Sequence, residues 1–319
     1  MNYTRNEAKD HAREHFVGVW AATVTPFAED TLAFDEDGFR RNVEHWVGTL
    51  RLGGLFVGGK QGEYFSMSVE ERKRSFEIAV ETAAGRAGIV TSCSDTNLDV
   101  VLELARHSQA IGADYVVIHS PVLHFAHDPE PTVYEYYRHL SERLDIGIAL
   151  WNHPDCGYLM SPELCDRIAD LPNVVAIKYS VDRDRYRRLT ELARDRIHVS
   201  TASEEEWLDN IVELGWRLYL CSTPPFLLQT EVDQRINDYT RLAFEGRVDE
   251  ARRVRDSLEP ARRAFREARP TGLPHAYTKY WLELLGRVGG PARRPVLPLT
   301  EAQRAATRDA FARSGLRLP

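Results

Sequence analysis

Short apolar runs alternate with amphipathic segments along the first two thirds of the chain. The apolar runs have the length and the β-branched content of buried strands. They cover residues 18–27, 54–59, 87–93, 114–121, 147–154, 174–180, 197–203 and 217–225. The segments between them have helical periodicity and cover residues 35–48, 68–84, 97–111, 132–143, 161–169, 182–194 and 204–214.

Local signals support these helices. Ser68 and Glu71 have the spacing of a capping box, Pro162 falls at a first helical position, and Gly112 follows the end of a helical pattern. Regular alternation of strands and helices predicts a parallel sheet covered by helices, and eight such units predict an α/β fold of the (β/α)8 TIM-barrel type. A doubly wound open sheet is the alternative, but no GxGxxG motif follows the first strand and the chain has no P-loop.

The strand pattern stops after residue 226. Helical patterns then cover residues 228–244, 248–268, 277–285 and 300–314, with Gly- and Pro-rich breaks between them. We therefore expect a barrel over residues 1–226 and a C-terminal helical extension over residues 227–319. Helical surface of this kind commonly builds oligomer contacts.

Composition narrows the class of protein. The chain has 43% apolar and 28% charged residues, as globular proteins do. The formal net charge is −7 and no Lys/Arg-rich run is present, which argues against nucleic acid as a partner. No apolar stretch approaches the length of a membrane span, and residues 1–16 are charged. A cytoplasmic protein with reduced thiols is expected, because the four cysteines are scattered: Cys93, Cys156, Cys165 and Cys221.

Lys178 is the most informative residue, because it ends the apolar run 173–180. Buried lysines are rare, since removing water from an ammonium group costs several kcal/mol. Of the 41 basic residues, five are lysines and 36 are arginines, yet an amine stands here. Arginine keeps its proton, whereas a desolvated lysine can become a neutral nucleophile. Lys178 is therefore a candidate Schiff-base residue, and a structural lysine paired with a carboxylate is the alternative.

Other candidates follow from the rule that a barrel active site lies at the carboxyl ends of the strands. Gly59 and Gly62, after the second strand, let the backbone approach a carboxylate and point amides at it. Lys60, between them, is expected to pair with that carboxylate or to lie near Lys178; a solvated loop lysine is the alternative. Three histidines fall near the same face and are candidates for acid–base chemistry or for structural hydrogen bonds: His119, His124 and His153. Their spacing does not predict a metal site.

Five features in order resemble the dihydrodipicolinate synthase / N-acetylneuraminate lyase superfamily of class I aldolases. These are Thr25-Pro26-Phe27, Gly59-x-x-Gly62-Glu63, Pro121, an aromatic residue before Asn152-x-Pro154, and Ile177-Lys178. The resemblance covers nearly the whole chain. It implies a TIM barrel, Schiff-base chemistry on Lys178, 2-oxo acid substrates, a homotetramer, and neither metal nor organic cofactor.

Departures from that pattern indicate a divergent member. Lys60-Gln61 stands where the synthases have two threonines, Leu123 replaces a tyrosine, and Trp151 replaces their catalytic tyrosine. Their arginine downstream of Asn152 has no counterpart. An indole only donates a hydrogen bond and cannot relay a proton. We therefore expect an enzyme other than dihydrodipicolinate synthase. The segment 62–68 is similar to sugar-acid dehydratases, and 176–179 to hydratase-aldolases of aromatic degradation.

The resulting hypothesis is a carbon–carbon or carbon–oxygen lyase that acts on a 2-oxo acid through Lys178. His153 or His124 replaces the missing tyrosine as the proton carrier, and Trp151 closes the pocket and favours a flat substrate. The expected substrate-binding residues are Thr25, Gly59, Lys60, Gln61, Gly62 and Asn152. The alternative is a ligand-binding or regulatory protein that has lost turnover on an aldolase scaffold.

Overall fold

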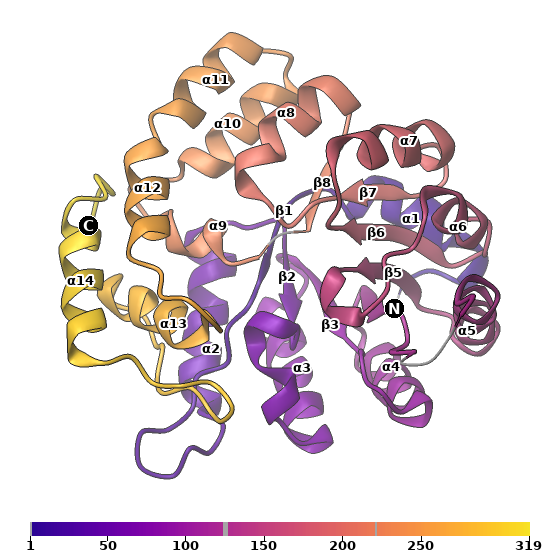
Figure 1. Ribbon diagram of the computed structural model, residues 1–319, viewed down its shortest axis with the longest axis horizontal. Helices are drawn as coiled ribbons and strands as arrows, with labels where there is room; N and C mark the ends of the chain where they lie inside the picture. Colours follow the sequence, from indigo (N-terminus) through magenta and orange to yellow (C-terminus); the bar gives the residue numbers. More distant parts are fainter. Residues whose placement is uncertain (1, 124–126, 221) are drawn as a thin grey trace.

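The computed structural model describes residues 2–123, 127–220 and 222–319. Within these ranges eight parallel strands form a nearly closed barrel that alternates with helices (Figure 1). The strands are β1 (Gly18–Ala22), β2 (Gly54–Val57), β3 (Gly88–Ser92), β4 (Tyr115–His119), β5 (Gly147–Asn152), β6 (Val174–Tyr179), β7 (His198–Ser200) and β8 (Leu218–Leu220). The predicted (β/α)8 fold is confirmed.

The strands pair in the order β7-β6-β5-β4-β3-β2-β1-β8. A side chain links the two outer strands of this order, because the Leu220 N–H donates a hydrogen bond to Ser200 Oγ at 2.6 Å. Side chains of the strands divide between an outer core under the helices and an inner core inside the barrel. The inner core includes Phe56 and Trp151, near the carboxyl ends of β2 and β5.

Helices cover the outside of the barrel. The predicted capping box starts one of them, since Ser68 Oγ accepts from the Glu71 N–H and the Glu71 carboxylate accepts from the Ser68 N–H. The helices are α2 (Glu36–Glu44), α3 (Val69–Ala83), α4 (Leu98–Ile111), α5 (Glu130–Arg143), α6 (Pro162–Ile168), α7 (Arg183–Ala193) and α8 (Glu204–Leu214). Among the described helices, none combines the length and the apolar character needed to cross a bilayer.

An N-terminal segment closes the end of the barrel where the strands begin. A short 3-10 turn (Arg5–Glu7) leads into α1 (Ala8–His15). Tyr3 Oη accepts a hydrogen bond from the Gly147 N–H at 2.9 Å, and Phe16 stacks on Tyr115 with 4.3 Å between ring centroids. The charged sequence of α1 did not predict this helix, because only two of its residues, Ala8 and Ala12, are buried.

Trp20 belongs to the inner core of the barrel, and two glycines leave the space for its ring. Its ring lies where side chains from the neighbouring strands would point: a Cβ at Gly54 would lie 2.3 Å from it, and one at Gly88 only 2.2 Å. The indole is fully buried, so it has no room to move away. The missing side chains of β2 and β3 thus create the space for one large ring.

Replacing Gly88 with alanine is therefore expected to lower the free energy of unfolding by about 1–3 kcal/mol, as overpacking of a core does. Denaturant unfolding measures the change. Gly48→Ala is the matched control, because the nearest atom to its Cβ is the end of the exposed Glu44 side chain, at 2.9 Å, rather than a buried ring. Equal effects of the two substitutions would contradict this account of the packing.

The C-terminal part of the chain is helical and packs beside the barrel (Figure 1). The helix expected over residues 248–268 is divided in two at Ser257 and Leu258, and Pro260 lies in the first turn of the second helix. Proline fits there because an amide at that position has no partner within the helix. The helices are α9 (Pro224–Leu227), α10 (Arg235–Phe244), α11 (Val248–Asp256), α12 (Glu259–Glu267), α13 (His275–Leu284) and α14 (Glu301–Ala312).

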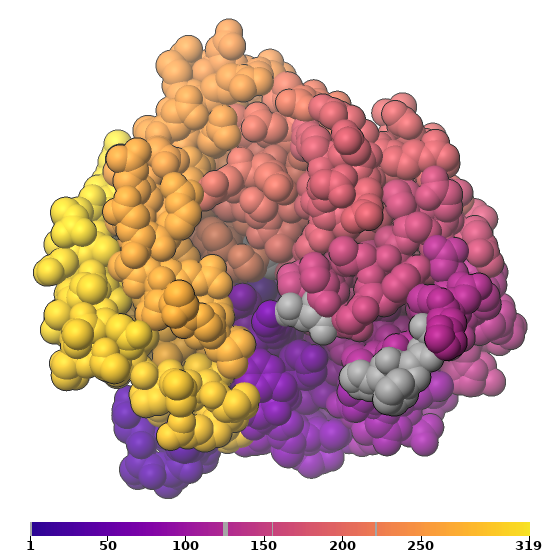
Figure 2. Space-filling view, viewed as in Figure 1, coloured from indigo at the N-terminus to yellow at the C-terminus, as the bar shows by residue number. Residues whose placement is uncertain are grey.

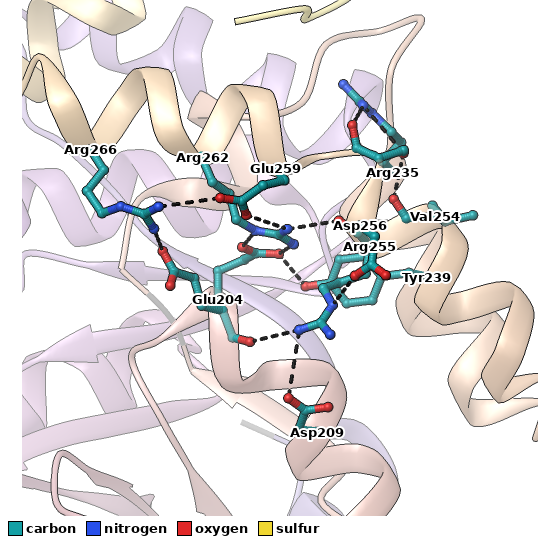
Figure 3. Close-up of polar contacts among 12 residues, drawn as sticks. Glu204, Asp209, Arg235, Tyr239, Val254, Arg255, Asp256, Glu259, Arg262 and Arg266 are labelled. Atoms are coloured by element: carbon teal, nitrogen blue, oxygen red, sulfur yellow. Dashed lines mark hydrogen bonds and ion pairs between the residues drawn. The ribbon is translucent and has the colours of Figure 1, made fainter.

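A buried ion pair fastens this extension to α8 (Figure 3). The guanidinium of Arg262 donates two hydrogen bonds to Glu204, at 2.6 and 2.8 Å. Tyr239 Oη donates a third to the same carboxylate, at 2.6 Å. Because Glu204 and Arg262 are both about 95% buried, the bidentate geometry and the tyrosine compensate for their lost hydration.

Candidate active site

Lys178 lies near the carboxyl end of β6 and points into the barrel. Its side chain is 5% exposed. Nζ lies 5.1 Å from the ring centroid of Phe56 and 5.8 Å from that of Trp151, two residues of the inner core. On the neighbouring strands, Trp151 and Ser200 lie in register with it. The amine therefore lies inside the barrel, at the end where barrel active sites are found, against two aromatic rings that exclude water.

The loop after β2 depends on backbone conformations that glycine allows. Gly58 has a φ of +69°, and a Cβ at Gly59 would lie 2.8 Å from the Phe56 ring. Short 3-10 turns then run over Lys60–Gly62 and Tyr64–Ser66, joined by Glu63 with a φ of +57°. A left-handed conformation is costly outside glycine and persists only where the surroundings enforce it.

The C-terminal extension supplies that enforcement. The Glu63 carboxylate is fully buried and pairs with Lys279 Nζ at 2.5 Å, while the Arg293 N–H donates to its other oxygen at 3.0 Å. Burial raises the pKa of Glu63 and lowers the pKa of Lys279, and each charge opposes the shift of the other. His275 Nε2 donates to the Lys60 carbonyl at 2.8 Å, since a carbonyl can only accept. Helix α13 thus holds the loop that carries Lys60.

A cavity of about 780 Å³ opens beside this loop. In Figure 2 the surface is hollowed between the C-terminal extension, in orange and yellow, and the purple and magenta segments that follow the early strands. The wall combines apolar and polar side chains: Lys60, Tyr64, Phe65, Met67, Val69, Arg72, Asp95, Thr96, His119, Val122, Trp151, Cys156, Leu273 and Pro295. Of the residues that the structure describes, Trp151 is part of this wall and Lys178 is not. The Lys178 amine therefore lies behind Trp151, one side chain away from the cavity.

His119 occupies this wall at the end of β4. Its ring is 4% exposed and its centroid lies 6.1 Å from that of Trp151. Nδ1 lies 2.7 Å from the Ser120 carbonyl and must donate to it, which leaves Nε2 as the nitrogen with a lone pair. Burial lowers the pKa of His119, and the Asp95 carboxylate opposes that shift. A neutral imidazole therefore lines the cavity.

Arg72 and Asp95 form a second polar group in the wall. The guanidinium of Arg72 is 2% exposed and donates to Asp95 Oδ2 at 3.0 Å and to the carbonyls of Ser92 and Ser94 at 3.1 and 2.9 Å. It also lies 5.3 Å from the Tyr64 ring centroid. Asp95 thus pairs with a buried arginine. Among the described residues, no group of three or more His, Cys, Asp and Glu side chains is placed to hold a metal ion.

The structure brings some of the predicted site residues together. Trp151 links Lys178 to the cavity, and Lys60 lines the same cavity. The His153 ring is partly buried, with its centroid 6.1 Å from that of Trp151, but it is not part of the described cavity wall. His124 lies outside the described residues.

Other predicted residues contact the protein itself. Thr25 Oγ1 donates to the Gly62 carbonyl at 2.8 Å and so supports the loop. The Asn152 amide exchanges two hydrogen bonds with the Met160 backbone, at 3.1 and 3.2 Å, and fixes the segment after β5. Gln61 lines a separate cavity of about 250 Å³, between the extension and the loops after β7 and β8.

Comparison with known proteins identifies what this architecture resembles. Residues 15–313 match the Dihydrodipicolinate synthetase family. A 4-hydroxy-tetrahydrodipicolinate synthase from Methanothrix thermoacetophila is 30% identical over 298 residues, which cover 92% of this chain and 95% of the relative. One from Phenylobacterium zucineum is 29% identical, over 94% of this chain and 98% of the relative.

Solved structures share the fold. Dihydrodipicolinate synthase from Thermotoga maritima superposes with a TM-score of 0.82 at 24% identity, over 95% of this chain and 99% of that chain. CdNal from Clostridium difficile, in complex with mannosamine, gives a TM-score of 0.81 at 21% identity, over 93% of this chain and 99% of that one.

The expectation that the missing tyrosine excludes dihydrodipicolinate synthase is wrong. Relatives that match this chain along nearly their whole length are named as that synthase. The exclusion rested on the departures at Lys60-Gln61, Leu123 and Trp151 and on the absent arginine, and it treated the missing tyrosine relay as the sole route for a proton. An imidazole in the same wall, such as His119, can also accept and return a proton.

Proposed function

Because this chain belongs to the dihydrodipicolinate synthetase family, we propose that it forms a Schiff base between Lys178 and a 2-oxo acid. The family indicates a class I aldolase-type lyase. The observation that carries the proposal is the position of Lys178, an amine buried between Phe56 and Trp151 at the carboxyl end of β6. An amine in that place is shielded from water and lies one side chain, that of Trp151, away from the cavity of about 780 Å³.

The chemistry follows from the amine. Neutral Nζ attacks the keto carbon of the substrate, the resulting carbinolamine loses water, and a protonated imine forms. Its positive nitrogen withdraws electrons, so a bond at the next carbon can release its electron pair into a conjugated enamine. That bond is carbon–carbon in an aldolase and carbon–hydrogen, followed by carbon–oxygen, in a dehydratase. Splitting one difficult step into easier ones lowers the barrier.

Two side chains prepare the substrate. Lys60 lies in the cavity wall, and we expect its ammonium to pair with the substrate carboxylate. Trp151 separates the amine from the cavity, so its indole has to shift for the imine to form. Its buried Nε1 makes no hydrogen bond within the described residues, so no such bond opposes that shift.

The size and lining of the cavity favour a substrate with an apolar body. About 780 Å³ is typical of sites for much larger molecules than a three-carbon acid. Several residues of the wall are apolar, and two of them, Phe65 and Leu273, are 40% and 46% exposed. Exposed apolar side chains grouped around a cavity mark a binding surface. We therefore propose a 2-oxo acid that carries an aromatic or similarly apolar group.

A kinetic panel tests this substrate class. Pyruvate, aryl-substituted 2-oxo acids and the synthase reaction of the named relatives are compared by kcat/KM. Leu273→Asp is expected to raise KM for the aryl acids about tenfold or more, because burial of a leucine-sized surface is worth about 1.5–3 kcal/mol. Its KM for pyruvate is expected to stay near that of the wild type.

Leu297→Asp serves as the matched control, since that leucine is 68% exposed and is not part of the cavity wall. A preference for pyruvate over every aryl acid, or equal effects of Leu273→Asp on both, would contradict the proposed substrate class. Binding of a 2-oxo acid without turnover would instead favour a non-catalytic binding protein. The position of Trp151 between Lys178 and the cavity is consistent with that second function.

A further inference from the structure

We propose that His119 is the general base and acid that moves the proton at the carbon next to the imine. This inference rests on the proposed function and assigns the role that the tyrosine replaced by Trp151 would otherwise fill. Histidines at strand ends are common, so the sequence around His119 does not by itself predict this role. Its position in the barrel carries the argument.

The register of the sheet places His119 next to the reacting group. His119, Trp151 and Lys178 are Cα partners across three adjacent strands, β4, β5 and β6. The Trp151 ring is 6.1 Å from the His119 ring and 5.8 Å from Lys178 Nζ, both measured to its centroid. His119 also lines the cavity, whereas the described wall does not include His153. A substrate bound to Nζ beside a displaced indole therefore extends toward His119.

A hydrogen bond to the Ser120 carbonyl fixes the tautomer of the neutral His119 ring. Because the Ser120 carbonyl accepts from Nδ1, the neutral ring keeps its proton on Nδ1 and its lone pair on Nε2. Nε2 makes no hydrogen bond to any residue that the structure describes, and the ring lines the cavity. A fixed tautomer with an accepting Nε2 is the arrangement that a general base requires.

Burial keeps this base neutral, and the surrounding charges change its pKa little. Asp95 and Arg72 face the ring, and their charges largely offset each other because they form an ion pair at 3.0 Å. Burial is the dominant influence and lowers the pKa of His119 below its ordinary value of 6.5. The other titratable groups around the cavity are Lys60, Tyr64, Cys156 and, behind Trp151, Lys178.

The proton transfer balances without another reagent. Nε2 takes a proton from the carbon next to the iminium, the carbon–hydrogen electrons form the enamine double bond, and the iminium nitrogen accepts the displaced pair. The imidazolium then returns the proton to that carbon or to an oxygen that leaves as water. In D₂O the first path replaces the hydrogens of that carbon with deuterium.

Deuterium exchange into the methyl group of pyruvate, followed by proton NMR, tests the assignment. His119→Asn keeps a donor for the Ser120 carbonyl but removes Nε2. We expect it to lower the exchange rate about 10²- to 10⁴-fold, the usual contribution of a general base. Borohydride trapping of pyruvate on Lys178 is expected to persist, because imine formation does not remove that proton.

The pH profile adds a readout that a structural role would not change. Exchange needs the neutral base, so the wild-type rate is expected to fall as pH drops through the pKa of His119, which burial places below the ordinary histidine value of 6.5. The residual exchange of His119→Asn is expected to lose that limb. His198→Gln is the matched control, because His198 is a second histidine on a strand. It is partly buried at the start of β7 and bonds to the Ala12 carbonyl.

The outcomes separate the two proposals. Trapping without exchange in His119→Asn supports the assignment, and His119→Gln repeats the test if the asparagine variant fails to fold. Wild-type exchange rates in a folded His119 variant overturn the assignment while Schiff-base formation stands. Loss of exchange in His153→Gln with retention in His119→Asn also overturns it. Absence of any trapped adduct in the wild type overturns the proposed function and the inference together.

Discussion

Replacing Lys178 with methionine is expected to lower kcat by about 10⁴- to 10⁶-fold, the range seen when a catalytic nucleophile or its partner is removed. Methionine retains most of the apolar volume between Phe56 and Trp151 but has no amine. Steady-state turnover of the best 2-oxo acid from the panel measures the loss. The fold is expected to survive, because a buried amine is exchanged for an apolar side chain of similar size.

Two controls give this prediction its meaning. Lys178→Arg keeps a positive charge but no nucleophile, so it is expected to be as inactive as the methionine variant. Lys73→Met removes a lysine whose partners, Glu70 and Glu103, lie on the outside of the barrel, and is expected to keep full activity. Substantial turnover in Lys178→Arg would mean that the residue acts through its charge rather than through its amine.

Replacing Lys279 with methionine is expected to lower the free energy of unfolding by about 3–5 kcal/mol, because it leaves the fully buried Glu63 carboxylate without its cation. Denaturant unfolding followed by tryptophan fluorescence measures the change. KM is expected to rise as well, since Glu63 and Lys60 belong to the same loop and its left-handed residue loses its anchor.

The double variant Glu63→Gln with Lys279→Met is the matched control. It removes both charges and is expected to recover most of the lost free energy, because no buried ion remains. A single variant that costs less than about 1 kcal/mol, or a double variant as unstable as Lys279→Met alone, would contradict the proposed role of this ion pair.

The sequence predicted the barrel because each strand is a continuous apolar run, but it did not predict where some strands end. The first run was expected over residues 18–27, yet β1 ends at Ala22; the last was expected over 217–225, and β8 spans Leu218–Leu220. Apolar residues continue in both places after the chain has left the sheet, as in Pro224–Leu227, which forms α9. Burial alone does not distinguish a strand from the apolar turn that follows it.

The site was predicted unevenly for a related reason. Scarcity of lysine identified Lys178, and the same signal was present at Lys279, but its partner Glu63 lies 216 positions earlier in the chain. Only the tertiary fold brings those two together. Strand register likewise decides which of the histidines near the strand ends lines the cavity. A shift of one residue would move a side chain to the opposite face of the sheet. His119 was therefore named among the histidines, but His153 and His124 were preferred as the proton carrier.

Borohydride reduction in the presence of 2-oxo acids, followed by intact mass and peptide mapping, tests the central claim most directly. The account predicts a substrate-dependent mass gain on the peptide that contains Lys178, strongest with an acid that carries an apolar group. Lys178→Met is expected to show no such gain. An adduct on another lysine, or no adduct with any acid of the panel, would contradict Schiff-base catalysis at Lys178.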